Sequence, residues 1–162
     1  MIQFEAIPGA MQLKTIQDFP ATRAELWDFI SRPENLKKIT PEAMGFEIKT
    51  KIEQDKAYAG QIIAYYVKPF PGIKTDWITE ITQVTEGEFF IDEQKLGPYA
   101  MWHHEHRLID IEGGIRMMDI ITYRAPFGIL GKMVEPLIIR SKLRGIFEYR
   151  EEKLTEIFGT LR

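Results

Sequence analysis

The stretch Ala100–Ile111, AMWHHEHRLIDI, divides its side chains into two alternating sets. One set contains Trp102, His104, His106 and Leu108, and a leucine in such a run is expected to face a hydrophobic core. A β-strand sends successive side chains to opposite faces, so two of the chain's three histidines lie on the buried face with Leu108. The stretch therefore predicts a strand whose inner face carries polar groups.

The run that follows, GIRMMDIITYRA at residues 114–125, carries a carboxylate on the corresponding face. Asp119 has the same parity as Ile121 and Tyr123, which are both expected to point inward. The glycine turn between the two runs allows two registers, with His106 either directly opposite Asp119 or diagonal to it. In both registers the imidazole and the carboxylate are within reach of each other.

The preceding run, GEFFIDEQK, adds a second carboxylate to this surface. Phe90, Asp92 and Gln94 share one face, and antiparallel pairing across the intervening turn brings Asp92 near His104. Buried polar groups cost free energy unless they are paired. The sequence therefore predicts a second inward imidazole–carboxylate pair.

Two earlier runs, at residues 60–68 and 74–84, direct aromatic side chains to the same surface. The resulting mixture of aromatic rings, carboxyls, imidazoles and an amide is more polar than a plain core, and it is typical of a ligand cavity. The expected ligand-binding residues are Tyr65, Trp77, Phe90, Asp92, Gln94, Trp102, His104, His106, Asp119, Ile121 and Tyr123.

Helical periodicity appears on both sides of the strand-like runs. Short helices are expected at residues 20–31 and 33–39, and one long amphipathic helix is expected from Gly131 to Phe158. The strand-like runs are 11–17, 45–52, 60–68, 74–84, 87–95, 100–111 and 114–125. This order predicts an α+β helix-grip fold. A curved antiparallel sheet of six to seven strands wraps around a long C-terminal helix, with two short helices after the first strand, in a single domain at residues 1–162.

Composition excludes several classes of function. The formal net charge of −3 does not suit a nucleic-acid binder, which needs a basic surface to neutralise phosphates. The chain has no cysteine, so disulfides, zinc–thiolate sites and thiol nucleophiles are excluded. The N-terminal residues do not resemble a signal peptide, and no apolar run approaches the ~20 residues of a membrane span. We therefore expect a cytoplasmic protein without stable membrane insertion.

Four segments carry a resemblance to a known family: DWITEIT, FIDEQKLGPYAMWHHEHRL, MMDIITYRAPFGILG and LRGIFEYREEKL. In order and over nearly the whole chain, they resemble the SRPBCC superfamily of START-related helix-grip domains. The similarity is to its bacterial polyketide cyclase/dehydratase and lipid transport-like branch. The resemblance implies a cavity between the sheet and the long helix that binds a lipid, quinone, sterol or polyketide. It implies no catalytic motif, because the superfamily contains both enzymes and carriers.

Three functions remain open for this chain. The favoured one is the binding of a small hydrophobic or amphipathic molecule, with no cofactor. The second is a cyclase or dehydratase that uses His104, His106, Asp92 and Asp119 as acid/base groups. The third is a protein-interaction module with a collapsed cavity. A metal site built from the two inward histidines and Asp119 is geometrically possible, but no metal is expected because no other strand supplies a third histidine.

Overall fold

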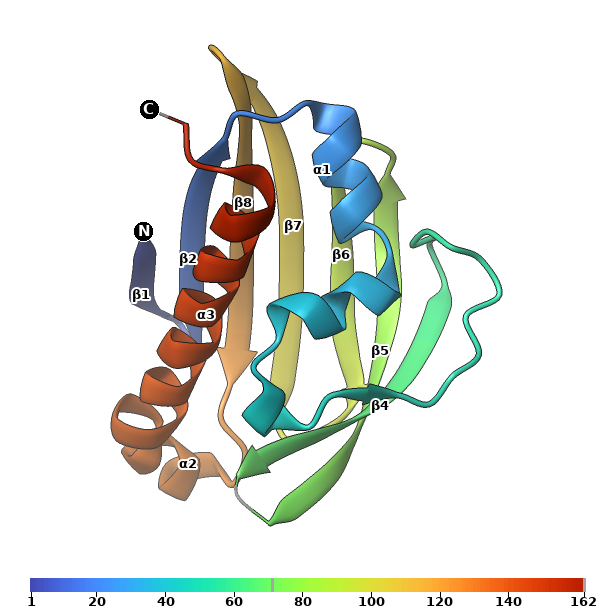
Figure 1. The fold of residues 1–162 in the computed structure, drawn as a ribbon. Helices are drawn as coiled ribbons and strands as arrows, with labels where there is room; N and C mark the ends of the chain where they lie inside the picture. Colours follow the sequence, from blue (N-terminus) through green and yellow to red (C-terminus); the bar gives the residue numbers. More distant parts are fainter. Residues whose placement is uncertain (71, 162) are drawn as a thin grey trace.

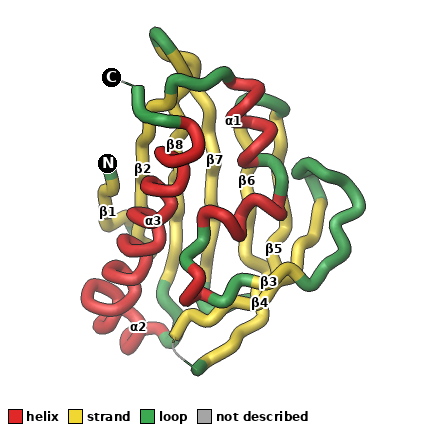
Figure 2. Tube along the Cα trace, in the orientation of Figure 1, coloured by secondary structure: helices red, strands yellow, loops and turns green. Residues whose placement is uncertain are grey.

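The computed structural model describes residues 1–70 and 72–161, and its centre is one curved sheet with helices on one face (Figure 1). The strands are β1 (Ile2–Ile7), β2 (Ala10–Phe19), β3 (Glu47–Ile48), β4 (Gln61–Phe70), β5 (Ile73–Thr85), β6 (Phe89–Leu96), β7 (Met101–Ile111) and β8 (Gly114–Arg124). The helices are α1 (Arg23–Ile30), the 3₁₀ helices η1 (Pro33–Ile39) and η2 (Glu42–Met44), α2 (Gly128–Val134), the π-helical turn η3 (Glu135–Ile139) and α3 (Arg140–Phe158). Figure 2 shows these helices together on one side of the strands.

The eight strands form a single antiparallel sheet in the order β1-β2-β8-β7-β6-β5-β4-β3. Irregularities in register interrupt the β4–β5 and β5–β6 pairings, and such bulges bend and twist a sheet. β7 is flanked by β6 and β8, which makes it a central strand. The expected α+β helix-grip class is confirmed, with a sheet that curves around the C-terminal helix.

The sheet has eight strands rather than the expected six to seven, because a strand precedes the first expected one. β1 pairs with β2 from Ile2 opposite Thr15 to Ile7 opposite Ala10. A tight turn joins them, and Gly9 adopts a φ of 82°, a value that favours glycine. The expected strand at residues 45–52 shrinks to β3, which contains only two residues.

The two expected short helices are present. Thr22 caps α1 reciprocally: its hydroxyl accepts the Glu25 N–H at 3.2 Å, and its own N–H donates to the Glu25 carboxylate at 2.8 Å. Leu26 and Trp27 are the buried residues of α1. The second helix, η1, is a 3₁₀ helix, and with α1 and η2 it covers the part of the sheet that α3 leaves open (Figure 1).

The expected helix from Gly131 to Phe158 is three segments, and only the last packs along the sheet. Pro136 cannot donate a backbone hydrogen bond, and it lies in the π-helical turn between α2 and α3. Tyr123 fixes this turn, because its hydroxyl donates to the buried Glu135 carboxylate at 2.6 Å. α2 leaves its large apolar side chains exposed, so the buried apolar stripe of the C-terminal helix lies in α3.

The inward face of α3 carries the residues that pack on the sheet. Leu143, Phe147 and Leu154 are almost completely buried at helical spacing, as expected for an amphipathic helix. Arg150 occupies the same face and is only 8% exposed. A cation therefore lies within an otherwise apolar stripe.

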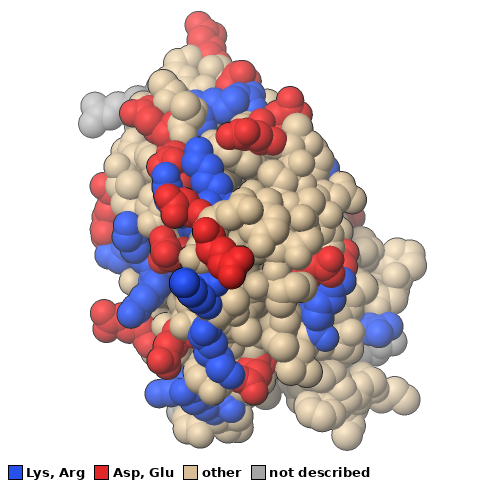
Figure 3. Space-filling model, turned by 90° about the vertical axis from the view of Figure 1, so that its right-hand side faces the viewer, with Lys and Arg blue, Asp and Glu red and all other residues tan. Residues whose placement is uncertain are grey.

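Charged side chains of both signs are interspersed on the face of the molecule in Figure 3, so this face lacks a single-sign field. Among the described residues, no helix combines the length and the apolar character that a membrane crossing requires.

Two glycines, one in α3 and one at the start of β8, differ in the space around them. Gly145 lies in α3 where an added Cβ would meet nothing, so Gly145→Ala should raise the free energy of unfolding by about 0.5–1 kcal/mol through helix propensity. At Gly114 a Cβ would overlap the backbone carbonyl of Phe19, and Gly114→Ala should cost about 1–3 kcal/mol. Urea unfolding measures both, and equal effects of the two substitutions would contradict the packing described.

Candidate functional site

A cavity of about 170 Å³ lies between the sheet, α3 and the short helices. Aromatic side chains form much of its wall: Phe29, Phe46, Tyr65, Trp77, Phe90, Tyr99, Trp102 and Phe147. Trp77 is at the centre of this group, with its ring stacked on Tyr65 at 5.9 Å and edge-on to Trp102 at 5.3 Å between centroids. Its indole N–H donates to Thr79 at 2.9 Å, which satisfies the one polar atom of the ring.

A cluster of two imidazoles and two carboxylates forms the polar part of the wall and its support. β7 supplies His104 and His106, and the strands on either side supply Asp92 and Asp119. In the observed register Asp92 is opposite His104, and His106 is directly opposite Asp119. The diagonal register of His106 and Asp119, which the sequence had left open, is therefore ruled out. We refer to these four residues as the His–Asp cluster.

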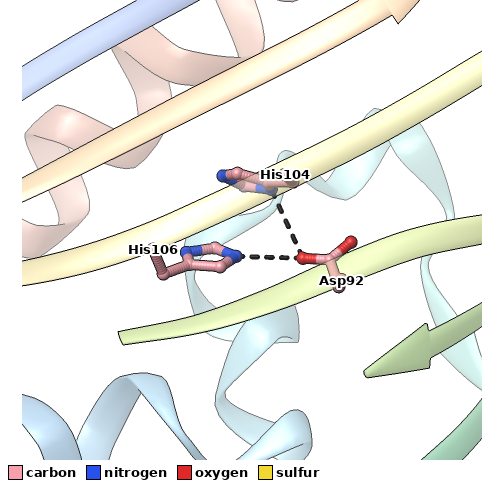
Figure 4. A group of neighbouring side chains, drawn as sticks. All are labelled: Asp92, His104 and His106. Atoms are coloured by element: carbon pink, nitrogen blue, oxygen red, sulfur yellow. Dashed lines mark hydrogen bonds and ion pairs between the residues drawn. The ribbon is translucent and has the colours of Figure 1, made fainter. Parts of the chain in front are cut away.

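The hydrogen bonds of the cluster run diagonally. His104 Nε2 lies 3.0 Å from Asp119 Oδ1. His106 Nε2 lies 3.0 Å from Asp92 Oδ2, as Figure 4 shows. The directly opposite groups are also close: His106 Nδ1 is 2.8 Å from Asp119 Oδ1, and His104 Nδ1 is 3.5 Å from Asp92 Oδ2. The 2.8 Å contact lies outside hydrogen-bond geometry, so we regard it as a contact between charges.

Each imidazole therefore contacts both carboxylates, and the two separate pairs expected from the sequence are one closed network. Close ring packing holds it in place. The two imidazole centroids are 3.7 Å apart, and Phe90 stacks on His106 at 4.1 Å. Behind the rings, the Thr15 hydroxyl donates to the second oxygen of Asp119 at 3.3 Å.

Burial and pairing oppose each other in setting the charges of the cluster. Burial raises the pKa of Asp92 and Asp119, but hydrogen bonds from the imidazoles and their positive charge outweigh it and lower both carboxyl pKa values. Burial also lowers the pKa of His106, yet its two carboxylate partners raise that pKa above its ordinary value. For His104, burial and the charge of His106 prevail, and they lower the pKa to about 4.

These shifts favour the charged forms of the two carboxylates and of His106, and the neutral form of His104. The positive charge of Arg150 in α3 contributes to the low pKa of Asp92. The two imidazoles titrate as a coupled pair rather than independently.

Most of the residues expected to bind ligand line the cavity: Tyr65, Trp77, Phe90, Asp92, Trp102, His104 and His106. Asp119 does not reach the cavity surface and lies behind the imidazoles that it supports. These placements follow directly from the alternation within β4 to β8.

Three expected binding residues have other roles in the structure. The Gln94 side chain bonds both backbone groups of Tyr99, at 2.7 and 3.2 Å, and so shapes the turn before β7. Ile121 is fully buried in an apolar cluster with Leu13 and Leu143, and it does not line the cavity. Tyr123 bonds Glu135 at the start of the C-terminal helix.

The cavity also includes residues that were not expected from strand alternation. Tyr99 lies in the turn before β7, and Ile146, Phe147 and Arg150 come from α3. Arg150 had a signal in the sequence, since it interrupts the apolar stripe of the long helix. The residues of η1 and η2 had no such signal in the sequence, because a short 3₁₀ helix lacks the periodicity that identifies a buried face.

The group that could hold a metal is Asp92, His104 and His106, each of which offers one ligand atom within 4.8 Å of the others. Asp119 would then orient the imidazoles, as carboxylates do for metal-bound histidines. Within this group, His106 and Asp92 are already hydrogen-bonded to each other at 3.0 Å. The expectation that no metal is bound stays a prediction from the sequence.

No protein-family model matches this chain, and no curated protein matches its sequence. Solved structures do match, and among them is a protein from Arthrobacter aurescens, with 16% identity over 95% of this chain and 91% of that chain at a TM-score of 0.70. Protein Ms6760 from Mycobacterium smegmatis is 15% identical over 97% of this chain and 98% of its own, with a TM-score of 0.64. Ara h 8.0201 is 16% identical over 91% of this chain and 99% of its own, with a TM-score of 0.59. Such likenesses establish a shared helix-grip-like fold.

A double-mutant cycle tests the cluster. His106→Leu should lower the free energy of unfolding by about 3–5 kcal/mol, because it leaves buried carboxylates without their cation. The double variant His106→Leu/Asp119→Leu should lose less free energy of unfolding than the sum of the two single losses, by at least about 1 kcal/mol. His103→Leu, on the outward face of β7, serves as the control and should add to Asp119→Leu within about 0.5 kcal/mol. Simple additivity of His106 and Asp119 would contradict the contact.

The two imidazoles should also give stability a maximum near pH 6.5. His104 has a lowered pKa, so the unfolded chain binds more protons between pH 6.5 and about 4, and stability falls as the pH falls through that window. His106 has a raised pKa, so its contribution is lost as the pH rises above 6.5. In the unaltered protein the free energy of unfolding should fall as the pH is lowered from 6.5 to 4.5. In His104→Gln it should stay nearly constant over this range. An unchanged slope would show that His104 is not held neutral.

Proposed function

We propose that this chain binds a small amphipathic molecule in the cavity between its sheet and its C-terminal helix. The observation that carries the proposal is the His–Asp cluster itself, of which His104, His106 and Asp92 line a cavity that is otherwise largely aromatic and aliphatic. An apolar wall with a few convergent polar groups is typical of small-molecule sites. A plain core gains no stability from buried ion pairs of this kind, because apolar side chains of similar volume fill the space equally well.

The volume of the cavity limits the ligand. About 170 Å³ is close to the ~150 Å³ that holds benzene in an engineered protein cavity, and it is below the ~300 Å³ at which typical ligand pockets begin. A ligand with one aromatic ring or a short chain is therefore preferred over a full-length lipid. The stacked and edge-on rings around Trp77 favour an aromatic or otherwise flat apolar body.

The fold supports this proposal at a coarse level. Ara h 8.0201, which shares it, is a Bet v1-like member of the SRPBCC superfamily. The superfamily resemblance in the sequence suggests lipids, quinones and polyketides as ligand classes. Of these, a small aromatic polyketide or a quinone ring suits the cavity volume better than an acyl lipid.

A second candidate function, acid/base catalysis of a cyclisation or dehydration, uses the same cluster. Two imidazoles that face the cavity from the same side of β7 favour it, because the pKa of His104 is lowered and the pKa of His106 is raised. In that case His106 would donate a proton and Asp119 would act only through the imidazoles. Turnover of the bound molecule separates this candidate from simple binding.

Binding can be tested with 4-phenylbutanol, a neutral probe with one ring and a short polar-ended chain. Its addition should shift the indole N–H resonances of Trp77 and Trp102, which line the cavity. Ile63→Phe places a larger side chain in the cavity from β4 and should lower the affinity for 4-phenylbutanol at least about tenfold. The added ring occupies the binding space, so the probe can bind only if the cavity repacks.

Ile62→Phe is the matched control, because it makes the same change on the outward, 48% exposed face of the same strand. It should leave the affinity within about twofold. Failure of 4-phenylbutanol to perturb either indole, or equal effects of the two substitutions, would reject a binding function for this cavity.

A further inference from the structure

We propose that Arg150 is an anion anchor within this cavity, and that the ligand is a small amphipathic carboxylic acid. The inference rests on the proposed binding function and specifies the chemical class of the molecule. The ligand's carboxylate would bind the guanidinium from α3, and its apolar body would lie against the aromatic wall.

Arg150 is a buried cation that lacks a partner. It is 8% exposed, it lines the cavity, and its Nε and Nη1 atoms are completely buried without a hydrogen bond. Within the described part of the chain, no carboxylate forms an ion pair with it and no acceptor receives a hydrogen bond from it. A buried guanidinium in this state costs several kcal/mol, on the order of the penalty for any unpaired buried ion.

Other buried charges in the structure are paired, which sets Arg150 apart. Glu135 accepts from Tyr123 at 2.6 Å and from Arg140 at 2.8 Å. Asp119 has both imidazoles as partners. The chain thus satisfies buried charges elsewhere, and the exception among the described residues points into the cavity.

The surroundings of Arg150 hold its guanidinium in position. Its central carbon lies 4.7 Å from the centroid of the Phe147 ring, one helical turn earlier in α3, in a cation–π arrangement. This contact restricts the positions that the guanidinium can adopt. A planar fork that is fixed and unpaired suits a carboxylate, which can accept two parallel hydrogen bonds.

Asp92 lines the same cavity as Arg150, and it is already engaged by the imidazoles. Its Oδ2 atom is 3.0 Å from His106 and 3.5 Å from His104. The positive charge of Arg150 lowers the pKa of Asp92 without an ion pair between them. Asp92 therefore leaves the guanidinium free for an anion from outside.

The test compares two probes with the same apolar body, 4-phenylbutyrate and 4-phenylbutanol, by NMR titration at pH 7. The acid should bind the unaltered protein about 10- to 100-fold more tightly than the alcohol, the range expected for hydrogen bonds to a buried charge. Arg150→Met should abolish this preference, so that the acid and the alcohol bind this variant with affinities within about threefold of each other.

Arg144→Gln provides the matched control, since it removes one cation from the exposed side of the same helix. It should retain the preference for the acid. The free protein supplies a second readout: Arg150→Met should unfold at a higher urea concentration than the unaltered protein, because it removes an unpaired buried charge.

Several results would overturn the inference. If 4-phenylbutanol binds and 4-phenylbutyrate binds no more tightly, the anchor is rejected and the proposed binding function stands. A preference for the acid that survives Arg150→Met, or a lower urea midpoint in that variant, would mark Arg150 as a structural residue. Absence of binding by both probes would reject the proposed function and the anchor together.

Discussion

The alternation of side chains along β7 is the constraint on which the rest of the structure depends. Because Leu108 and Trp102 face inward, His104 and His106 must face inward as well, on a central strand with neighbours on both sides. Two buried imidazoles need partners, and the flanking strands supply one carboxylate each, Asp92 and Asp119. A one-residue slip of either neighbour would turn its carboxylate outward, so the cluster also fixes the register of three strands.

The wall of the cavity combines two kinds of surface with different functions. The aromatic side chains remove water and provide area for an apolar body, which is the main source of binding energy for such molecules. The polar side chains carry specificity, since a buried charge rejects any molecule that leaves it unpaired. The hydrogen bond between Tyr123 and Glu135 holds the start of the C-terminal helix in place, and neither residue lines the cavity.

The sequence predicted the strands of the sheet better than it predicted the ends of the fold. Period-two alternation in β4 to β8 identified the inward residues, because each run contains enough apolar positions to define its face. β1 was missed although Ile2, Phe4 and Ala6 alternate, since it is short and its pairing depends on a turn at Gly9. The break in the C-terminal helix lies at Pro136, and the exposure of α2 depends on tertiary packing that local periodicity does not contain.

The site was predictable to the same extent and for the same reason. Parity brought His104, His106, Asp92 and Asp119 together, while the diagonal hydrogen bonds depend on the tilt of the rings, which no sequence pattern specifies. Arg150 could be recognised as unusual in its helix, but its lack of a partner is a property of the folded structure alone.

A crystal structure of the protein with 4-phenylbutyrate would test the combination of cavity, cluster and cation most directly. We expect the phenyl ring against Trp77 and Trp102, and both carboxylate oxygens within about 3.2 Å of guanidinium nitrogens of Arg150. We also expect the His–Asp cluster to keep its four contacts. A cavity filled by its own side chains, with Arg150 turned to pair directly with Asp92, would contradict this arrangement.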